Sequence, residues 1–151
     1  MRAAIREAVK AGNVDEVPIG AVIVVGDNIV SRGHNLTEKT QIATRHAEII
    51  AIEKACKKLH SWRLDGAELF VTLEPCAMCA GAIANARIKK VYFGAHEPKS
   101  GCAESKFRVL SDSGLNHSVE FSGGIMGADC QKLLQDYFRQ KRQAVAQNPT
   151  K

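Results

Sequence analysis

The stretch from Ala67 to Cys79 reads AELFVTLEPCAMC and joins a strand to the start of a helix. Residues 67–72 form a compact, largely apolar segment of the length expected for a strand. Pro75 follows at a position where a helix can begin, because proline fits the first turn of a helix, and we expect the helix to continue to Ile88. A strand that leads into a helix is typical of βαβ units, so the stretch predicts a largely parallel sheet.

Five segments have the composition of strands. Residues 17–25 are β-branched and mostly apolar, and turn residues separate them from a second strand at 29–32, which predicts an antiparallel hairpin. The other three expected strands are 67–72, 90–94 and 119–121. Because helices are expected between the strands, the chain predicts an α/β fold, namely a three-layer α/β/α domain over residues 1–151 with a mixed five-stranded sheet.

The helices are predicted from apolar residues spaced three or four positions apart. The first is expected at residues 1–11, and the last at about 128–145, with an apolar stripe against the body and a frayed tail from Ala144 to Lys151. The helix that follows residue 45 would bury Ile49, Ile52, Cys56 and Leu59. Loops are expected at 33–45 and 97–114.

The composition is that of an ordinary globular protein of 151 residues, with 45% hydrophobic and 25% charged residues. The longest apolar run, residues 19–25, is too short to cross a bilayer, and charges among the first seven residues interrupt the apolar core that a signal peptide needs. We therefore expect a cytoplasmic protein with no membrane partner. The net charge of +5 is compatible with a polyanionic partner but does not identify one.

Two of the five cysteines have a metal-binding spacing. An odd number of cysteines without an export signal indicates reduced thiols rather than a disulfide framework. Cys76 and Cys79 are one helical turn apart, so both sulfurs can reach one ion, and His46 would be a third ligand. Three protein ligands leave a fourth position for water, which is typical of a hydrolytic zinc site, and Glu48 supplies a free carboxylate as base.

Other roles for these residues stay open. Cys76 and Cys79 could form a disulfide or a redox pair, but neither explains Glu48. A structural zinc would normally take a fourth Cys or His ligand, and the other histidines have no ligand-like spacing. Because His46 and Glu48 are two positions apart and do not share a helix face, we expect them to converge only where a helix points its N-terminal end at the metal. The pattern places both His46 and Cys76 at helix starts.

The joined pattern of His46-Ala47-Glu48 and Pro75-Cys76-Ala77-Met78-Cys79 resembles the signature of the zinc-dependent, cytidine deaminase-like superfamily. Within that superfamily, longer segments spread over nearly the whole chain resemble the bacterial tRNA-specific adenosine deaminases. The segments that carry this resemblance are 16–22, 33–35, 71–82, 87–88, 91–95, 99–101, 115–117 and 133–142.

The resemblance implies a homodimer with one Zn²⁺ per subunit, bound by His46, Cys76 and Cys79. The implied reaction converts adenosine to inosine at the wobble position of a tRNA anticodon and releases ammonia. Glu48 would carry the proton from a zinc-activated water to the base and then to the leaving amine, and Asn35 would hydrogen-bond the base edge. The remaining implied contacts are Val17, Ala47 and Leu73 as walls of the base pocket, and Lys99, Ser100, Phe138 and Arg142 against the anticodon loop.

Two other functions are compatible with the same residues. A deaminase of free bases, nucleosides or nucleotides would share the zinc signature, although the basic C-terminal helix and the segment around Asn35 favour an RNA substrate. A catalytically silent, zinc-stabilised RNA-binding module would have no use for Glu48. Tyr137 and Phe138 lie on an apolar helical stripe, so we expect at least one of them to be core rather than a stacking surface for bases.

Overall fold

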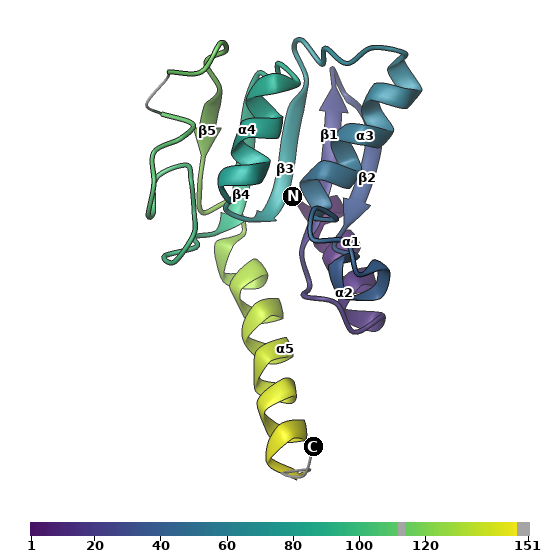
Figure 1. The fold of residues 1–151 in the computed structure, drawn as a ribbon, viewed down its shortest axis with the longest axis vertical. Helices are drawn as coiled ribbons and strands as arrows, with labels where there is room; N and C mark the ends of the chain where they lie inside the picture. The colour runs from purple at the N-terminus through teal and green to yellow at the C-terminus, as the bar shows by residue number, and fades with distance from the viewer. Residues whose placement is uncertain (112–113, 148–151) are drawn as a thin grey trace.

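The computed structural model describes residues 1–111 and 114–147 (Figure 1). Its centre is a five-stranded sheet with the order β2-β1-β3-β4-β5. The strands are β1 (Gly20–Val25), β2 (Asn28–His34), β3 (Glu68–Leu73), β4 (Lys90–Ala95) and β5 (Glu120–Ser122). β1 is antiparallel to both of its neighbours, whereas β3, β4 and β5 run parallel. The predicted mixed sheet with an antiparallel N-terminal hairpin is therefore confirmed.

Helices cover both faces of this sheet. They are α1 (Arg2–Asn13), α2 (Thr37–Thr40), α3 (Ala47–Leu59), α4 (Ala77–Asn85) and α5 (Gly127–Gln147). α3 and α4 lie beside one another over the same face (Figure 1). Alternation along β1 separates the layers, because Ala21 and Ile23 join the core under α3 and α4, whereas Val22 packs with Ala3 and Ala4 of α1. This arrangement gives the predicted α/β/α layers. No helix in the described ranges is long and apolar enough to cross a membrane.

The buried face of α3 differs from the predicted one. Leu59 is 41% exposed, and the other three residues of the expected face are only partly buried. The residues that α3 does bury are Ala47, Glu48, Ile50, Ala51 and Ala55. The helix approaches β2 so closely that a Cβ on Gly33 would overlap the carbonyl oxygen of Ala47. Because only small residues allow this approach, the alanines form the closely packed face. Ile52 and Cys56 pack at the margin of the core, and Leu59 is exposed.

Several predicted boundaries are wrong. β1 begins at Gly20, so Val17 lies in the loop that precedes it. α4 ends at Asn85 rather than Ile88, because Arg87 adopts a left-handed φ of 62° and the chain then turns to bury Ile88 in the core. The segment 33–45, expected to be a loop, contains the end of β2 and the short helix α2.

α5 begins against β4 and extends beyond the ends of the strands (Figure 1). The predicted apolar stripe lies on the body in part, because Cys130 is fully buried and Leu133, Leu134 and Tyr137 are half-buried. Tyr137 contacts the loop after α1 through a hydrogen bond to Asp15, whereas Phe138 is 45% exposed. Residues 144–147, expected to be frayed, are helical, and the rest of that expected tail, 148–151, lies outside the described residues.

Candidate active site

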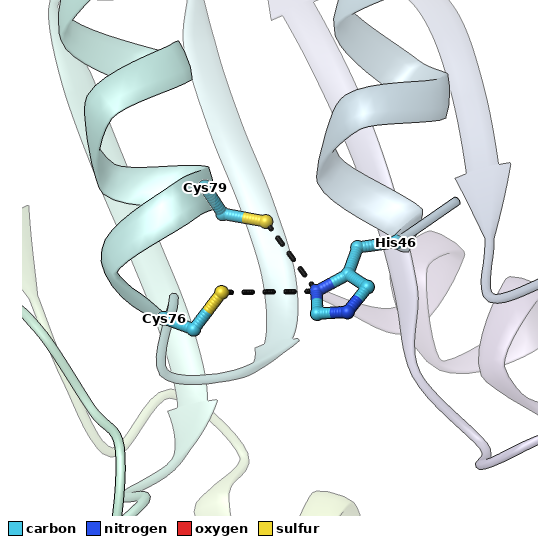
Figure 2. Close-up of side chains that lie close together, drawn as sticks. All are labelled: His46, Cys76 and Cys79. Carbon is cyan, nitrogen blue, oxygen red and sulfur yellow. Dashed lines mark hydrogen bonds between the residues drawn. The ribbon is translucent and has the colours of Figure 1, made fainter. Parts of the chain in front are cut away.

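Two helix starts bring three metal-ligating side chains together. His46 and Cys76 are the N-cap residues of α3 and α4, and both have extended backbone conformations. Cys79 lies in the first turn of α4. The Nδ1 atom of His46 is 3.7 Å from the sulfur of Cys76 and 3.6 Å from that of Cys79 (Figure 2). The expectation that both segments point a helix N-terminus at one centre is confirmed.

The spacing of these three atoms fits a zinc ion. Zinc lies about 2.3 Å from a thiolate sulfur and about 2.0–2.1 Å from an imidazole nitrogen, which at tetrahedral angles places sulfur and nitrogen roughly 3.5–3.6 Å apart. The two observed separations, 3.6 and 3.7 Å, are close to that value, and all three ligand atoms lie within 4.8 Å of one another. The group can therefore hold a metal ion through two sulfurs and one nitrogen. All five cysteines are free, so the Cys76–Cys79 disulfide is excluded in this structure.

The three ligands are electrostatically coupled. Hydrogen bonds with Cys79 and, to a smaller extent, with His46 outweigh burial and lower the pKa of the Cys76 thiol to about 4. The hydrogen bond between the two thiols, together with burial, raises the pKa of Cys79, because only one of two adjacent thiols is easily deprotonated when no cation is present. The thiolate of Cys76 in turn raises the pKa of His46. A pair of thiols that shares one proton in this way is suited to a divalent cation, which favours both thiolates.

Glu48 is the second residue of α3 and is 4% exposed. Burial raises the pKa of this carboxyl to about 7, although the backbone amide and the charge of His46 act in the opposite direction. The side chains of Cys76 and Cys79 also influence its pKa, which places Glu48 next to the ligand group. A carboxyl with a pKa near neutrality can both accept and donate a proton at pH 7, as a general acid and base must.

The side chain of Asn35 links the end of β2 to α3. Its Oδ1 accepts a hydrogen bond of 2.9 Å from the backbone N–H of Ala47, the first residue of α3, and the residue is 6% exposed. Of the residues predicted to wall a base pocket, Val17 and Leu73 are partly exposed and Ala47 is fully buried. The hydrogen bond therefore places the Asn35 side chain at the first residue of α3, which follows His46 in the chain.

The residues expected to contact RNA meet at a second location. A surface hollow of about 400 Å³ between α5 and the loop after β4 is lined by Lys99, Gln131, Leu134, Gln135, Phe138 and Arg142. Phe138 is 45% exposed, whereas Tyr137 is half-buried and donates a hydrogen bond of 3.1 Å from its hydroxyl to the carbonyl oxygen of Asp15. The two adjacent aromatics thus have different environments, and Tyr137 is the one that packs. Ser100 is exposed on the same loop as Lys99.

Glu74 is a buried residue to which the sequence analysis assigned no role. Glu74 directly follows β3, two positions before Cys76, and its carboxylate accepts hydrogen bonds from the loop after β4. The sequence did contain one sign of this role, because Glu74 is a charged residue directly after a buried apolar strand. A charged residue at such a position is rarely buried unless it has partners. The partners themselves are 23 to 31 positions away and have no local pattern.

A family model and a curated relative both match this chain to deaminases. A model of the MafB19-like deaminase family matches residues 1–142. The chain is 47% identical to the tRNA-specific adenosine deaminase of Bacillus subtilis (strain 168) over 142 residues, which cover 94% of this chain and 88% of that protein.

Two solved structures are informative. One, from studies of A-to-I editing by tRNA:A34 deaminases at the wobble position of transfer RNA, has a TM-score of 0.86 and 44% identity, covering 89% of this chain and 97% of that chain. A guanine deaminase from Bacillus subtilis has a TM-score of 0.62 and 39% identity, covering 70% of this chain and 67% of that chain. Both the coverage and the TM-score are higher for the tRNA-acting protein.

Proposed function

This chain belongs to the family of MafB19-like deaminases and tRNA-specific adenosine deaminases, and we propose that it converts adenosine to inosine at the wobble position of a tRNA anticodon. The observation that carries the proposal is the combination of three convergent metal ligands, His46, Cys76 and Cys79, with the buried acid Glu48. Residues 1–151 would act as one deaminase domain. The reaction adds water to C6 of the base and releases the exocyclic amine as ammonia.

Zn²⁺, one per subunit, is the cofactor that fits the Cys₂His ligand set, and when bound it supplies a Lewis acid that activates water at neutral pH. Glu48 is the proton carrier in this proposal. Its carboxylate takes one proton from the attacking water and delivers it to N1 of adenine. It then takes the proton of the hydroxyl added at C6 and delivers it to the exocyclic amine, which leaves as ammonia while the C6 carbonyl forms. The pKa of about 7 for the buried Glu48 supports this role, since both protonation states are accessible near neutral pH.

Asn35 orients the base. Because its Oδ1 is already held by the N–H of Ala47, the amide NH₂ is the group left to donate to an acceptor on the base edge. Val17 and Leu73, which are partly exposed, line the pocket, and Ala47 supports its floor from a buried position. Fixing the amide at one end reduces the conformational freedom that base binding must remove, which favours correct orientation.

The anticodon loop is bound in the hollow between α5 and the loop after β4. Phe138 offers an exposed ring on which a splayed base can stack, and Lys99 and Arg142 offer cations to the phosphates. Ser100 adds a hydroxyl beside Lys99. This grouping supports RNA rather than a free base as the substrate, because a free base needs no such surface outside its pocket. Since tRNA is the substrate, the protein acts in the cytoplasm.

A homodimer is supported by the apolar residues at and after the C-terminal end of α3. Leu59 is 41% exposed and Trp62, just beyond the helix, is 64% exposed, and Ile49 on the same helix is only partly buried. A group of exposed apolar residues is typical of a surface that a partner covers. Sedimentation of the wild type should give twice the monomer mass of 16.4 kDa, and Leu59→Glu should shift the protein towards monomer. A monomeric wild type at micromolar concentration would contradict the dimer.

The proposed reaction is tested with the zinc-loaded protein and an anticodon stem-loop that carries a wobble adenosine. The matched control RNA has the same loop with the adenosine moved by one position, and free adenosine, cytidine and guanine are tested separately. Inosine and ammonia should form in equal amounts from the wobble adenosine alone. Deamination of free guanine without action on the stem-loop would instead assign the chain to the base deaminases.

A further inference from the structure

We propose that Glu74 is a positioning residue for RNA binding: its carboxylate holds the loop from Glu97 to Ser105 in the conformation that presents Lys99 and Ser100 to the anticodon loop. The inference rests on the proposed function, because it assigns a role in binding the same substrate. It concerns a residue that lies beside the metal ligands in sequence but whose side-chain hydrogen bonds go to the loop after β4.

Glu74 is 2% exposed, and its side chain is surrounded by donors from one loop. Oε1 accepts hydrogen bonds from the backbone N–H groups of Ala103, Glu104 and Ser105, at 3.1, 2.8 and 2.9 Å. Oε2 accepts the backbone N–H of Glu97 at 3.0 Å and also the hydroxyl of Ser105. One carboxylate therefore accepts hydrogen bonds from both ends of the loop and holds these ends together.

The loop packs tightly against Glu74 at Gly101. A Cβ on Gly101 would lie 2.5 Å from the carboxyl carbon of Glu74 and 2.6 Å from the carbonyl oxygen of Glu97. Contacts this short do not occur in folded proteins, and one of them involves backbone, which cannot rotate away. Gly101 is thus required for the loop to close on Glu74, from a position 25 residues removed from the metal ligand Cys76.

The same loop carries the residues assigned to RNA. Lys99 and Ser100 are exposed at its outer turn, where the backbone N–H of Lys99 donates to the side chain of Glu97 at 2.9 Å. The loop is also tied to the metal-binding segment, since the N–H of Cys102 donates to the carbonyl oxygen of Pro75 at 2.8 Å. By holding the loop in this conformation, Glu74 therefore fixes the position of Lys99 relative to the metal ligands.

A glutamate suits this position better than a glutamine does. An ionised carboxylate only accepts hydrogen bonds and has about four acceptor sites, which suits a site lined entirely by N–H and O–H donors. A glutamine of the same shape would turn one of its two acceptor atoms into an NH₂ group that faces those donors. Hydrogen bonds to a charged acceptor are stronger than those to a neutral one, so the amide would release part of the loop without leaving a cavity.

The test compares Glu74→Gln and Gly101→Ala with Glu120→Gln, which removes an exposed carboxylate of β5 and serves as the control. In the first two variants KM for the anticodon stem-loop should rise by about tenfold or more, as expected when one or two charged hydrogen bonds are lost. Zinc content and kcat at saturating RNA should stay close to wild type. Hydrogen exchange at the amides of residues 103–105 should accelerate, and this readout does not depend on activity.

The outcomes separate this proposal from the proposed function. Wild-type KM and wild-type exchange in Glu74→Gln would overturn it, and so would a fall in kcat or zinc content with KM unchanged, because that would place Glu74 in the metal site. If Glu74→Gln does not fold, Gly101→Ala and Ser105→Ala are judged by the same criteria. If the wild type does not deaminate the stem-loop, the proposed function fails, and fluorescence anisotropy with the same RNA still decides whether Glu74 positions the loop for binding.

Discussion

Asn35 and Ala47 are joined by a hydrogen bond of 2.9 Å from the backbone N–H of Ala47 to the side-chain oxygen of Asn35. This bond caps the helix that begins next to the ligand His46. It also determines which end of the Asn35 amide is left for the substrate. One side chain is therefore expected to contribute to both stability and base recognition, and the two contributions can be separated.

Asn35→Asp keeps an acceptor for Ala47 but replaces the NH₂ donor that the base requires. We expect thermal stability and zinc content near those of wild type, and kcat/KM lower by roughly 10- to 100-fold, as for the loss of one hydrogen bond of about 1.5–3 kcal/mol. Asn35→Ala removes the cap as well and should also lower the midpoint of thermal unfolding. Equal kcat/KM for Asn35→Asp and wild type would remove Asn35 from base recognition.

Glu48→Gln should bind zinc as the wild type does yet lose about 10²- to 10⁴-fold in kcat, because an amide cannot carry a proton. Metal analysis and single-turnover deamination of the stem-loop measure the two properties. Glu53→Gln, on the exposed side of the same helix, is the matched control and should retain wild-type kcat. A Glu48→Gln enzyme with undiminished turnover would assign proton transfer to another group.

Removal of zinc should lower stability as well as abolish activity, because the ligands come from two separate helices that the ion would hold together. Dialysis against a chelator should lower the thermal midpoint, and added Zn²⁺ should restore it. Cys79→Ala should show the low midpoint at all zinc concentrations. A midpoint independent of zinc would show that the site adds nothing to stability.

Glu7 predicts an acid-dependent loss of stability. Burial alone would raise the pKa of Glu7, but hydrogen bonds with Lys10 and His34 outweigh burial and hold the pKa below its ordinary value of 4.5. A carboxyl with a lowered pKa stabilises the folded state above pH 4.5, and this contribution disappears as the pH falls through the folded-state pKa. The difference in unfolding free energy between wild type and Glu7→Gln should therefore shrink on acidification. A difference that is constant from pH 7 to pH 3 would rule out this linkage.

Phe138 and Tyr137 should respond differently to substitution. Phe138→Ala should raise KM for the stem-loop by about 5- to 100-fold with little change in stability, since stacking of one base contributes about 1–3 kcal/mol. Tyr137→Phe loses the hydrogen bond to Asp15 and should lower the free energy of unfolding by about 1 kcal/mol without changing KM. Reversed phenotypes would mean that the ring of Tyr137 is the one that contacts RNA.

Much of the fold and the metal site could be predicted from local pattern. The order of strands and helices follows from the apolar spacing and the turn residues, and the ligand group follows from a His-x-Glu and a Cys-x-x-Cys pattern at two helix starts. The elements and each of the two ligand patterns depend on residues within one or two turns of each other, whereas the structure brings His46 and Cys76, 30 positions apart, together. The buried face of α3 could not be predicted in this way, because it depends on how closely Gly33 of another element allows the helix to approach.

The sequence by itself thus determined which residues can hold a metal and supply a base, since ligand type and spacing are properties of neighbouring positions. Only the tertiary structure decided that Lys99 and Arg142 line one hollow and that Phe138 faces solvent while Tyr137 packs. It also decided that Glu74 binds a loop up to 31 residues away. Those relationships join residues far apart in the chain. They depend on the packing of whole elements, which no short segment encodes.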